Sequence, residues 1–370
     1  MPDVFLSLED SRRDWEELFS VATASPYQSF QFLSEWFDTI GREDGATPFV
    51  IVDRDEDGRP RCLIPLCVET HLGCRIATFL GGRESNFNLP LIRPDVSYDE
   101  ARLRALLMKA AQRSDAAPDL FYFRNQPRRF EEFDNPLVFA ASRPSASFAY
   151  GLTLPATAEA LAGKFSKDAR KKLRKKEARL AQVGELRYEH QPTGDRAQAI
   201  VEALIVQKST RFSEMGVGNL FHKSGPKDLL RRTAANGAIE LHALSVNGRI
   251  VATYAGLTRG GRFSAMLNSF DMDEEISRSS PGDLLLHALM RNLVERGFSN
   301  FDLGAGEARY KNAVCDETIE LYDTMLPVSA CGALAAPIFM NLLRLKRRIK
   351  QTPALARVFG RLRRLVKVAR

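Results

Sequence analysis

Two acids, a tyrosine and a lysine near residue 300 are of the types that move protons in group-transfer reactions. They are Asp302, Glu307, Tyr310 and Lys311, in a polar, glycine-containing segment. A carboxylate can accept a proton from a nucleophile or orient it, and a phenol can donate a proton to a leaving group. We therefore expect Asp302 or Glu307 to accept the proton or orient the acceptor, and Tyr310 to donate.

Each of these side chains also has a structural interpretation. Asp302 could cap the loop from Gly304 to Gly306, because aspartate often binds backbone N–H groups in turns. Glu307 could simply be solvated, as most glutamates are. Tyr310 could be a core tyrosine and Lys311 a surface lysine. The residue types alone leave these alternatives open.

The segment before residue 283 could bind an anion. Pro281 suits the first turn of a helix, and Ser279 and Ser280 are candidate caps for its free N–H groups. Apolar residues then recur at helical spacing until Gly297: Leu284, Leu285, Ala288, Leu289, Leu293 and Val294. A helix N-terminus beside Arg278 is suited to a phosphate or pyrophosphate, so the predicted donor-binding residues are Arg278, Ser279, Ser280, Pro281 and Gly282.

Strands are expected on both sides of this helix. Residues 239–246, 249–258 and 262–269 have strand-like apolar patterns, and Asn247-Gly248 and Gly260-Gly261 supply the turns between them. Residues 298–303 form a further short strand after Gly297. The predicted order is three antiparallel strands, an anion-binding loop, a helix and another strand.

This order resembles the GNAT superfamily of acetyltransferases. It is more closely similar to the CelD/BcsL-like branch, whose relatives include the FemAB peptidoglycan aminoacyltransferases. The residues that carry the resemblance in this second half are Ser280, Pro281, Gly282, Leu284, Leu285, Gly297, Asp302, Gly304, Gly306, Tyr310 and Lys311. Further matches are Trp15, Pro26, Gln28, Phe32, Trp36, Phe165, Ser166, Lys167, Arg170, Leu173, Arg174 and Gly184.

The resemblance implies an α/β (α+β) fold of two tandem GNAT-like domains, each a mixed central sheet flanked by helices. It implies acetyl-CoA or another acyl-CoA as co-substrate, and oxyanion stabilisation by Lys311. The usual GNAT pyrophosphate loop is Arg/Gln-x-x-Gly-x-Gly/Ala. Here Arg278 is followed by Ser-Ser-Pro-Gly-Asp, which keeps the helix N-terminus and loses one glycine.

We divide the chain into three parts: a degenerate N-terminal GNAT-like domain (1–150), an acyltransferase domain (151–330) and a basic helical tail (331–370). The first part contains strand patterns at 49–52, 62–68, 75–79 and 120–123, and a helix at 101–112. The second begins with a very basic helix at 166–182. Its Arg170 and Arg174 lie one turn apart and could clamp a polyanionic substrate, although a solvated helix face explains the same charges.

The tail combines apolar and basic residues at helical spacing in 338–349 and from Thr352 onward. Such helices suit an anionic membrane surface, but they could equally pack on the catalytic domain. A third hypothesis is that the arginines bind a small anionic regulator such as a cyclic dinucleotide.

The charge distribution and the cysteines argue against some classes of function. The net charge is +7, yet residues 324–370 contain eleven basic residues and no acidic one, so the body of the chain is net acidic. This distribution argues against a surface built throughout for nucleic acid. The five cysteines form no CxxC pair, and we expect reduced, buried thiols and no metal site.

The N-terminus has no secretory pattern and no stretch is long enough to span a membrane. We therefore expect a cytoplasmic protein, peripheral on the inner membrane if the tail binds there. By resemblance, the predicted function is acyl-CoA-dependent N-acylation, most simply N-acetylation, of an amino sugar in exopolysaccharide or cell-envelope synthesis. The alternatives are aminoacyl-tRNA-dependent transfer onto a peptidoglycan precursor, in which the basic helix would contact tRNA, and a non-catalytic, ligand-responsive membrane module.

Overall fold

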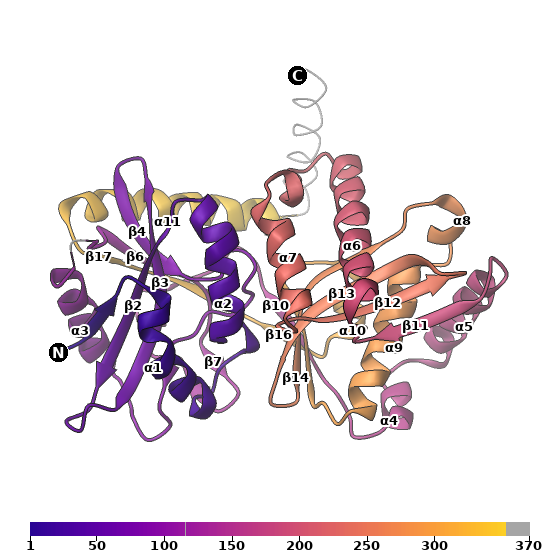
Figure 1. Ribbon diagram of the computed structural model, residues 1–370, viewed down its shortest axis with the longest axis horizontal. Helices are drawn as coiled ribbons and strands as arrows, with labels where there is room; N and C mark the ends of the chain where they lie inside the picture. Colours follow the sequence, from indigo (N-terminus) through magenta and orange to yellow (C-terminus); the bar gives the residue numbers. More distant parts are fainter. Residues whose placement is uncertain (115, 353–370) are drawn as a thin grey trace, which may run out of the picture. The chain divides into compact units, whose positions relative to one another are not determined.

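The chain folds into two compact units, each built on its own sheet (Figure 1). The computed structural model describes residues 1–114 and 116–352, apart from the side chain of Arg309. Unit 1 comprises Met1–Ala149, Ala305–Glu307 and residues 318–352, and unit 2 comprises Tyr150–Gly304 and Ala308–Glu317. The predicted α/β class, with mixed sheets flanked by helices, is confirmed.

Unit 1 contains an 8-stranded mixed sheet in the order β1-β2-β3-β4-β6-β17-β9, with β5 paired to β3. Its strands are β1 (Asp3–Phe5), β2 (Thr47–Arg54), β3 (Pro60–His71), β4 (Cys74–Phe79), β5 (Leu91–Ile92), β6 (Leu120–Pro127), β9 (Arg143–Pro144) and β17 (Leu321–Pro327). A separate hairpin joins β7 (Arg129–Phe130) and β8 (Phe133–Asp134). The helices are α1 (Leu8–Val21), η1 (Pro26–Gln28), α2 (Phe30–Trp36), η2 (Phe37–Gly41), α3 (Glu100–Gln112) and α11 (Ala330–Gln351).

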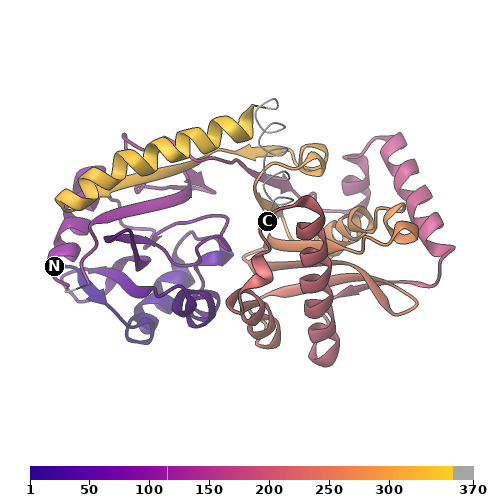
Figure 2. The same ribbon diagram turned by 90° about the horizontal axis from the view of Figure 1, so that it is seen from above.

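Helices α3 and α11 lie on opposite faces of this sheet. Strand residues alternate between the two faces, so Phe121 and Phe123 face one way and Leu120 and Tyr122 the other. The first pair belongs to the main core with Leu103, Leu106 and Leu107 of α3. The second pair packs with Cys74 and Ile76 beneath Ala335, Ala336, Phe339 and Leu343 of α11. Figure 2 shows α11 running along this side of the unit.

The position of β17 and α11 differs from the predicted domain division. Residues 318–330 were expected in the second domain and residues 331–370 as a separate tail, but β17 pairs with β6 and α11 packs on unit 1. A strand pattern predicts that a segment is extended, but does not predict which sheet it joins. The second tail helix, predicted from Thr352 onward, lies outside the described residues.

Three of the five cysteines are buried in unit 1, as predicted from their apolar surroundings. Burial raises the pKa of Cys67 to about 12 and that of Cys74 to about 11, so both thiols stay protonated at neutral pH. Among the described residues, Cys74, Asp119 and Cys331 form one group whose potential metal-ligand atoms lie within 4.8 Å of one another. Asp119 already accepts hydrogen bonds from Ser329 and the backbone of Arg75.

Unit 2 contains a 7-stranded sheet in the order β11-β12-β13-β14-β15-β10-β16. Its strands are β10 (Ala149–Thr153), β11 (Leu186–His190), β12 (Glu240–Val246), β13 (Arg249–Arg259), β14 (Arg262–Phe270), β15 (Asn300–Ala305) and β16 (Glu317–Ile319). Its helices are α4 (Ala158–Gly163), α5 (Lys167–Ala181), α6 (Gly194–Met215), η3 (Leu220–His222), α7 (Gly225–Ala235), α8 (Glu274–Ser277), α9 (Pro281–Glu295) and α10 (Arg309–Val314). Helix α6 packs with α7, whereas α9 packs with α4 and α5, and both groups contact β12, β13 and β14.

Local signals predicted the central run of unit 2, from β12 to β15. Asn247 and Gly248 have positive φ angles of 48° and 81°, as a tight hairpin turn requires. Gly260 and Gly261 also have positive φ angles, in the turn of the next hairpin. None of the helices in residues 1–352, position 115 aside, has the length and hydropathy that a membrane-spanning helix needs.

Candidate active site

The pairing of β14 with β15 ends partway along both strands. The two strands are parallel and pair only from Arg262↔Asn300 to Ser264↔Asp302, although β14 continues to Phe270 and β15 to Ala305. The carboxyl-terminal halves of these neighbouring strands are therefore not joined by a ladder. In α/β sheets, ligands commonly bind outside the carboxyl ends of parallel strands.

The N-terminus of α9 lies at the same end of β14. A Cβ atom added at Gly282 would lie 3.5 Å from Cδ1 of Phe270, the last residue of the strand. Helix α9 begins at Pro281, as predicted, and Gly297 follows it with φ +80°. In the first turn of α9, Asp283 and Leu284 already donate their N–H groups to the backbone oxygen of Ser280, at 3.0 and 3.3 Å. Pro281 has no N–H, which leaves Gly282 to offer its N–H group beside the diverging strands.

The two serines before Pro281 do not cap α9, contrary to the prediction. Ser280 is the N-cap residue, but its backbone is left-handed (φ 50°, ψ 62°) and its hydroxyl makes no capping hydrogen bond. The hydroxyl of Ser279 is fully buried and has no hydrogen-bond partner among the described residues. A non-glycine residue in this conformation and an unsatisfied buried hydroxyl both cost free energy, and such costs are often found at binding sites.

Helix α5 is attached to the start of α9 by two polar contacts. Lys176 Nζ lies 2.6 Å from Asp283 Oδ2, and Arg179 Nη1 donates to the backbone oxygen of Arg278 at 3.0 Å. The Arg278 guanidinium itself pairs with Glu274. Arg170 and Arg174 are exposed on α5, which begins after the N-cap Ser166 as predicted.

A hydrogen-bonded polar cluster lies where β14 and β15 separate. Tyr254 of β13 and Asn268 of β14 are cross-strand neighbours, and both hydrogen-bond to Tyr310. Burial raises the pKa of both tyrosines above the usual value, so each keeps its proton. Lys208 of α6 donates to the backbone oxygen of Asn268 at 2.9 Å.

Lys208 has a strongly lowered pKa. Burial, and then the nearby positive charges of Arg211 and Lys311, lower its pKa to about 8. The neutral amine is therefore far more populated near pH 8 than for an ordinary lysine, whose pKa is about 10.4. A lysine of this kind can accept a proton at physiological pH.

Tyr310 and Lys311 lie in the short helix α10 and not in the polar loop that the sequence predicted. Lys311 is buried, and its Nζ donates to the backbone oxygen of Gly304 at 2.9 Å. It also lies 5.5 Å from the centroid of the Tyr150 ring. The structure therefore brings Tyr310 and Lys311 together with Lys208, at the carboxyl ends of β14 and β15.

Asp302 is enclosed by two partners of β14. Its carboxylate accepts hydrogen bonds from Arg262 Nη1 at 2.6 Å and Ser264 Oγ at 2.7 Å, at the last pair before the strands diverge. Burial raises its pKa, an effect that the Arg262 charge opposes. Glu307 belongs to unit 1, where it is exposed and accepts the N–H of Phe148 at 3.4 Å.

No role was predicted from the sequence for Lys208, Tyr254 or Asn268. A signal for Lys208 was present, because it follows Leu204 by four residues and so continues the buried stripe of α6. A lysine on the apolar face of a helix is unusual and indicates a specific environment. Tyr254 and Asn268 had no such signal, since their roles depend on which strands are neighbours.

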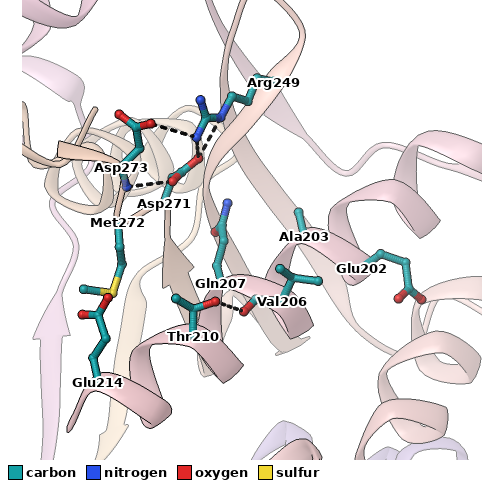
Figure 3. Close-up of a pocket in the computed structure, with 10 residues that line it drawn as sticks. All are labelled: Glu202, Ala203, Val206, Gln207, Thr210, Glu214, Arg249, Asp271, Met272 and Asp273. Carbon is teal, nitrogen blue, oxygen red and sulfur yellow. Dashed lines mark hydrogen bonds and ion pairs between the residues drawn. The ribbon is translucent and has the colours of Figure 1, made fainter. Parts of the chain in front are cut away.

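A hollow of about 610 Å³ lies elsewhere on unit 2 (Figure 3). It is lined by residues of α6, among them Glu202, Val206 and Glu214, and by the segment 271–273 after β14. Three of its charged groups are paired with one another: Arg249 binds Asp271 at 2.6 Å and reaches Asp273 at 3.6 Å. We do not assign a reaction step to this hollow.

Part of the chain matches a known protein family. Residues 167–312 match the family model described as an acetyltransferase (GNAT) domain. No curated protein sequence matches the chain. The chain is similar in structure to FemX, with a TM-score of 0.57 and 10% identity over 91% of this chain and 99% of that chain.

Two further solved structures have the same fold. One is a conserved protein of unknown function from Bacteroides thetaiotaomicron VPI-5482 (TM-score 0.56, 15% identity, 88% and 100% coverage). The other is the C-terminal domain of a protein described as a lysylphosphatidylglycerol synthetase, from Agrobacterium fabrum (TM-score 0.53, 14% identity, 91% and 97% coverage). The chain therefore shares the fold of these proteins, and its residues 167–312 match the model of a GNAT acetyltransferase domain.

Proposed function

We propose that unit 2 transfers an acyl group from an acyl-CoA thioester to an amine, most simply an acetyl group. The observation that carries this proposal is Lys208, a lysine of lowered pKa that donates to the backbone of Asn268, the cross-strand neighbour of Tyr254, where β14 and β15 part. Acyl transfer to an amine requires removal of a proton from the nucleophile, and a neutral lysine can accept that proton.

Each proposed step uses one group of the cluster. The acceptor nitrogen attacks the thioester carbonyl and gives its proton to Lys208. The positive charge of Lys311 stabilises the tetrahedral oxyanion, and Tyr310 protonates the departing CoA thiolate. Asp302 acts as a positioning residue, because it binds Arg262 and Ser264 at the point where the strands separate. Glu307 is given no step.

The acyl-CoA pyrophosphate would lie at the start of α9, held by Arg278, Ser279, Ser280 and the N–H group of Gly282, which follows Pro281. The unpartnered Ser279 hydroxyl supports this placement, since a bound phosphate oxygen could accept its hydrogen bond. Arg278 would have to exchange its partner Glu274 for the ligand, a small cost for so exposed a pair.

Thermal unfolding with acetyl-CoA, longer acyl-CoAs and free CoA tests the donor site. At saturating ligand we expect the melting temperature to rise by about 5 °C. Gly282→Trp should abolish the shift by filling the start of α9, whereas Gly282→Ala should keep it, because a methyl group at this position makes only ordinary contact with Phe270.

No shift with any CoA in the wild-type protein would contradict the acyl-CoA proposal. Tight, strongly salt-dependent tRNA binding in its place would favour aminoacyl-tRNA-dependent transfer. The exposed basic face of α5, with Arg170 and Arg174, is the feature that would serve that alternative.

We propose an amino sugar of cell-envelope or exopolysaccharide synthesis as the acceptor, on the resemblance to CelD/BcsL-like proteins.

We further propose that the outer face of α11 lies on an anionic membrane surface. Four large apolar residues are exposed along one side of this helix, from 74% for Leu334 to 54% for Leu345, with Ile338 and Leu342 between them. Arg344 and Arg348 are exposed on the same helix. Apolar and basic groups together favour anionic lipid surfaces.

Sedimentation with anionic and uncharged vesicles tests the α11 proposal. We expect the wild type to bind the anionic vesicles. The double variant Ile338→Glu/Leu342→Glu should bind about tenfold more weakly, because two apolar side chains that would contact the lipid become charged. Val21→Glu, at another exposed apolar position, is the matched control and should bind normally. Equal binding by all three proteins would contradict the proposal.

A further inference from the structure

Unit 1 has a hollow of its own, about 380 Å³ in volume, lined mainly by polar residues. Four basic side chains line it: Arg83 from the loop after β4, Arg124 from β6, and Lys346 and Lys350 from α11. A single acid, Asp323 of β17, lies among them. All the lining residues belong to unit 1, so this hollow is separate from the proposed donor site at α9.

The four cations are not neutralised by the protein. Within residues 1–114 and 116–352, no carboxylate lies within ion-pair distance of any of them. Arg124 lies over the Tyr122 ring, 5.5 Å from its centroid, and Lys350 donates to the Ser147 hydroxyl at 2.6 Å. The hollow therefore carries an excess of positive charge.

Asp323 offsets only part of this excess, because it supplies one carboxylate among four cations. Its carboxylate already accepts hydrogen bonds from Ser145 Oγ at 2.5 Å and the backbone N–H of Asn125 at 3.0 Å. Burial raises its pKa. The pKa of Lys346 is lowered, first by burial and then by the charges of Lys350, Arg83 and Arg124, and the charge of Asp323 opposes this change only in part.

The packing of α11 fixes the positions of the two lysines. Leu343, Lys346 and Lys350 follow one another at helical spacing on the side that lines the hollow. Arg347, between the lysines, donates to the backbone oxygen of Ser145 at 2.6 Å and to Glu320 at 3.2 Å. Ser85, which also lines the hollow, has a buried hydroxyl with no hydrogen-bond partner among the described residues.

We propose that this hollow is a second ligand site and binds the pyrophosphate group of a small molecule. Several cations around one hollow match adjacent phosphoryl groups, because lysine and arginine form their strongest hydrogen bonds with phosphate oxygens. The unpartnered Ser85 hydroxyl supplies a further donor. A volume of about 380 Å³ suits a small ligand and not a nucleic acid strand.

Calorimetric titration of the full chain with inorganic pyrophosphate and with ADP at low salt tests this site. We expect both to bind the wild type, and Lys346→Ala/Lys350→Ala to weaken binding by about tenfold or more. Arg344→Ala/Arg348→Ala is the matched control: it removes the same charge from the same helix at positions that do not line the hollow. This control should bind as the wild type does.

Comparison of ADP with inorganic pyrophosphate shows which kind of molecule carries the pyrophosphate group. Tighter binding of ADP would identify a nucleoside diphosphate as the occupant, and equal binding would identify the free anion. Absence of binding to the wild type, or equal weakening in both double variants, would overturn the proposal, because the latter indicates diffuse attraction to α11. Circular dichroism of each variant verifies that the helix is intact.

Discussion

Lys208→Met is expected to remove the ascending limb of the pH profile for acyl transfer near pH 8 and to lower turnover about 100-fold. The physical reason is that the wild-type amine has a pKa of about 8, set by burial and by the charges of Arg211 and Lys311. Its neutral fraction, and with it the rate, therefore rises as the pH increases through 8. Methionine keeps the length of the side chain but cannot accept a proton.

Lys311→Met is the matched variant that distinguishes the role of Lys311 from that of Lys208. The loss of an oxyanion-stabilising charge should lower turnover about 100-fold at every pH, with the limb retained. Because the Lys311 charge also contributes to the lowered pKa of Lys208, the limb should move to slightly higher pH in this variant. The measurement is CoA release from acetyl-CoA with an amino-sugar acceptor between pH 6 and 10. An unchanged profile in Lys208→Met would remove that residue from the mechanism.

Asp302→Ala is expected to lower the free energy of unfolding by about 3 kcal/mol, because it deprives the largely buried Arg262 of its carboxylate partner. Side-chain exposure is 1% for Asp302 and 11% for Arg262, so water cannot replace the lost interaction well. Urea unfolding of the wild type and the variant measures the change.

Glu295→Ala is the control for Asp302→Ala, since it breaks an exposed pair with Arg291 of similar length. It should cost less than about 0.5 kcal/mol. The double variant Arg262→Met/Asp302→Leu should recover much of the loss, because apolar residues can replace a buried ion pair at little cost. Similar losses for Asp302→Ala and Glu295→Ala would mean that the buried pair adds nothing to stability.

The elements predicted correctly from the sequence are those with local signals. Pro281 and Gly297 bracket α9, and Asn247-Gly248 forms the turn between β12 and β13. These residues act through their own backbone angles, so their effect can be predicted without knowledge of distant contacts.

The predictions that failed depended on contacts between distant segments or on fine backbone geometry. The lowered pKa of Lys208 arises from burial against strands some sixty residues away, as its bond to Asn268 shows. Residues 318–330 were assigned to the second domain, because no local signal predicts the pairing of β17 with β6. Ser280 has the composition of a cap, but its left-handed backbone leaves its hydroxyl without that bond.

The pairing of β17 with β6 and β9 also sets the order in which the protein is completed on the ribosome. Unit 1 begins at the first residue, yet its sheet and the α11 layer require residues 321–351. Domains usually fold in the order of their synthesis, but here the emerging chain leaves the edge of β6 unpaired while unit 2 is being made. The N-terminal unit is therefore the last to be finished, and a nascent chain cut short before β17 exposes an aggregation-prone strand edge.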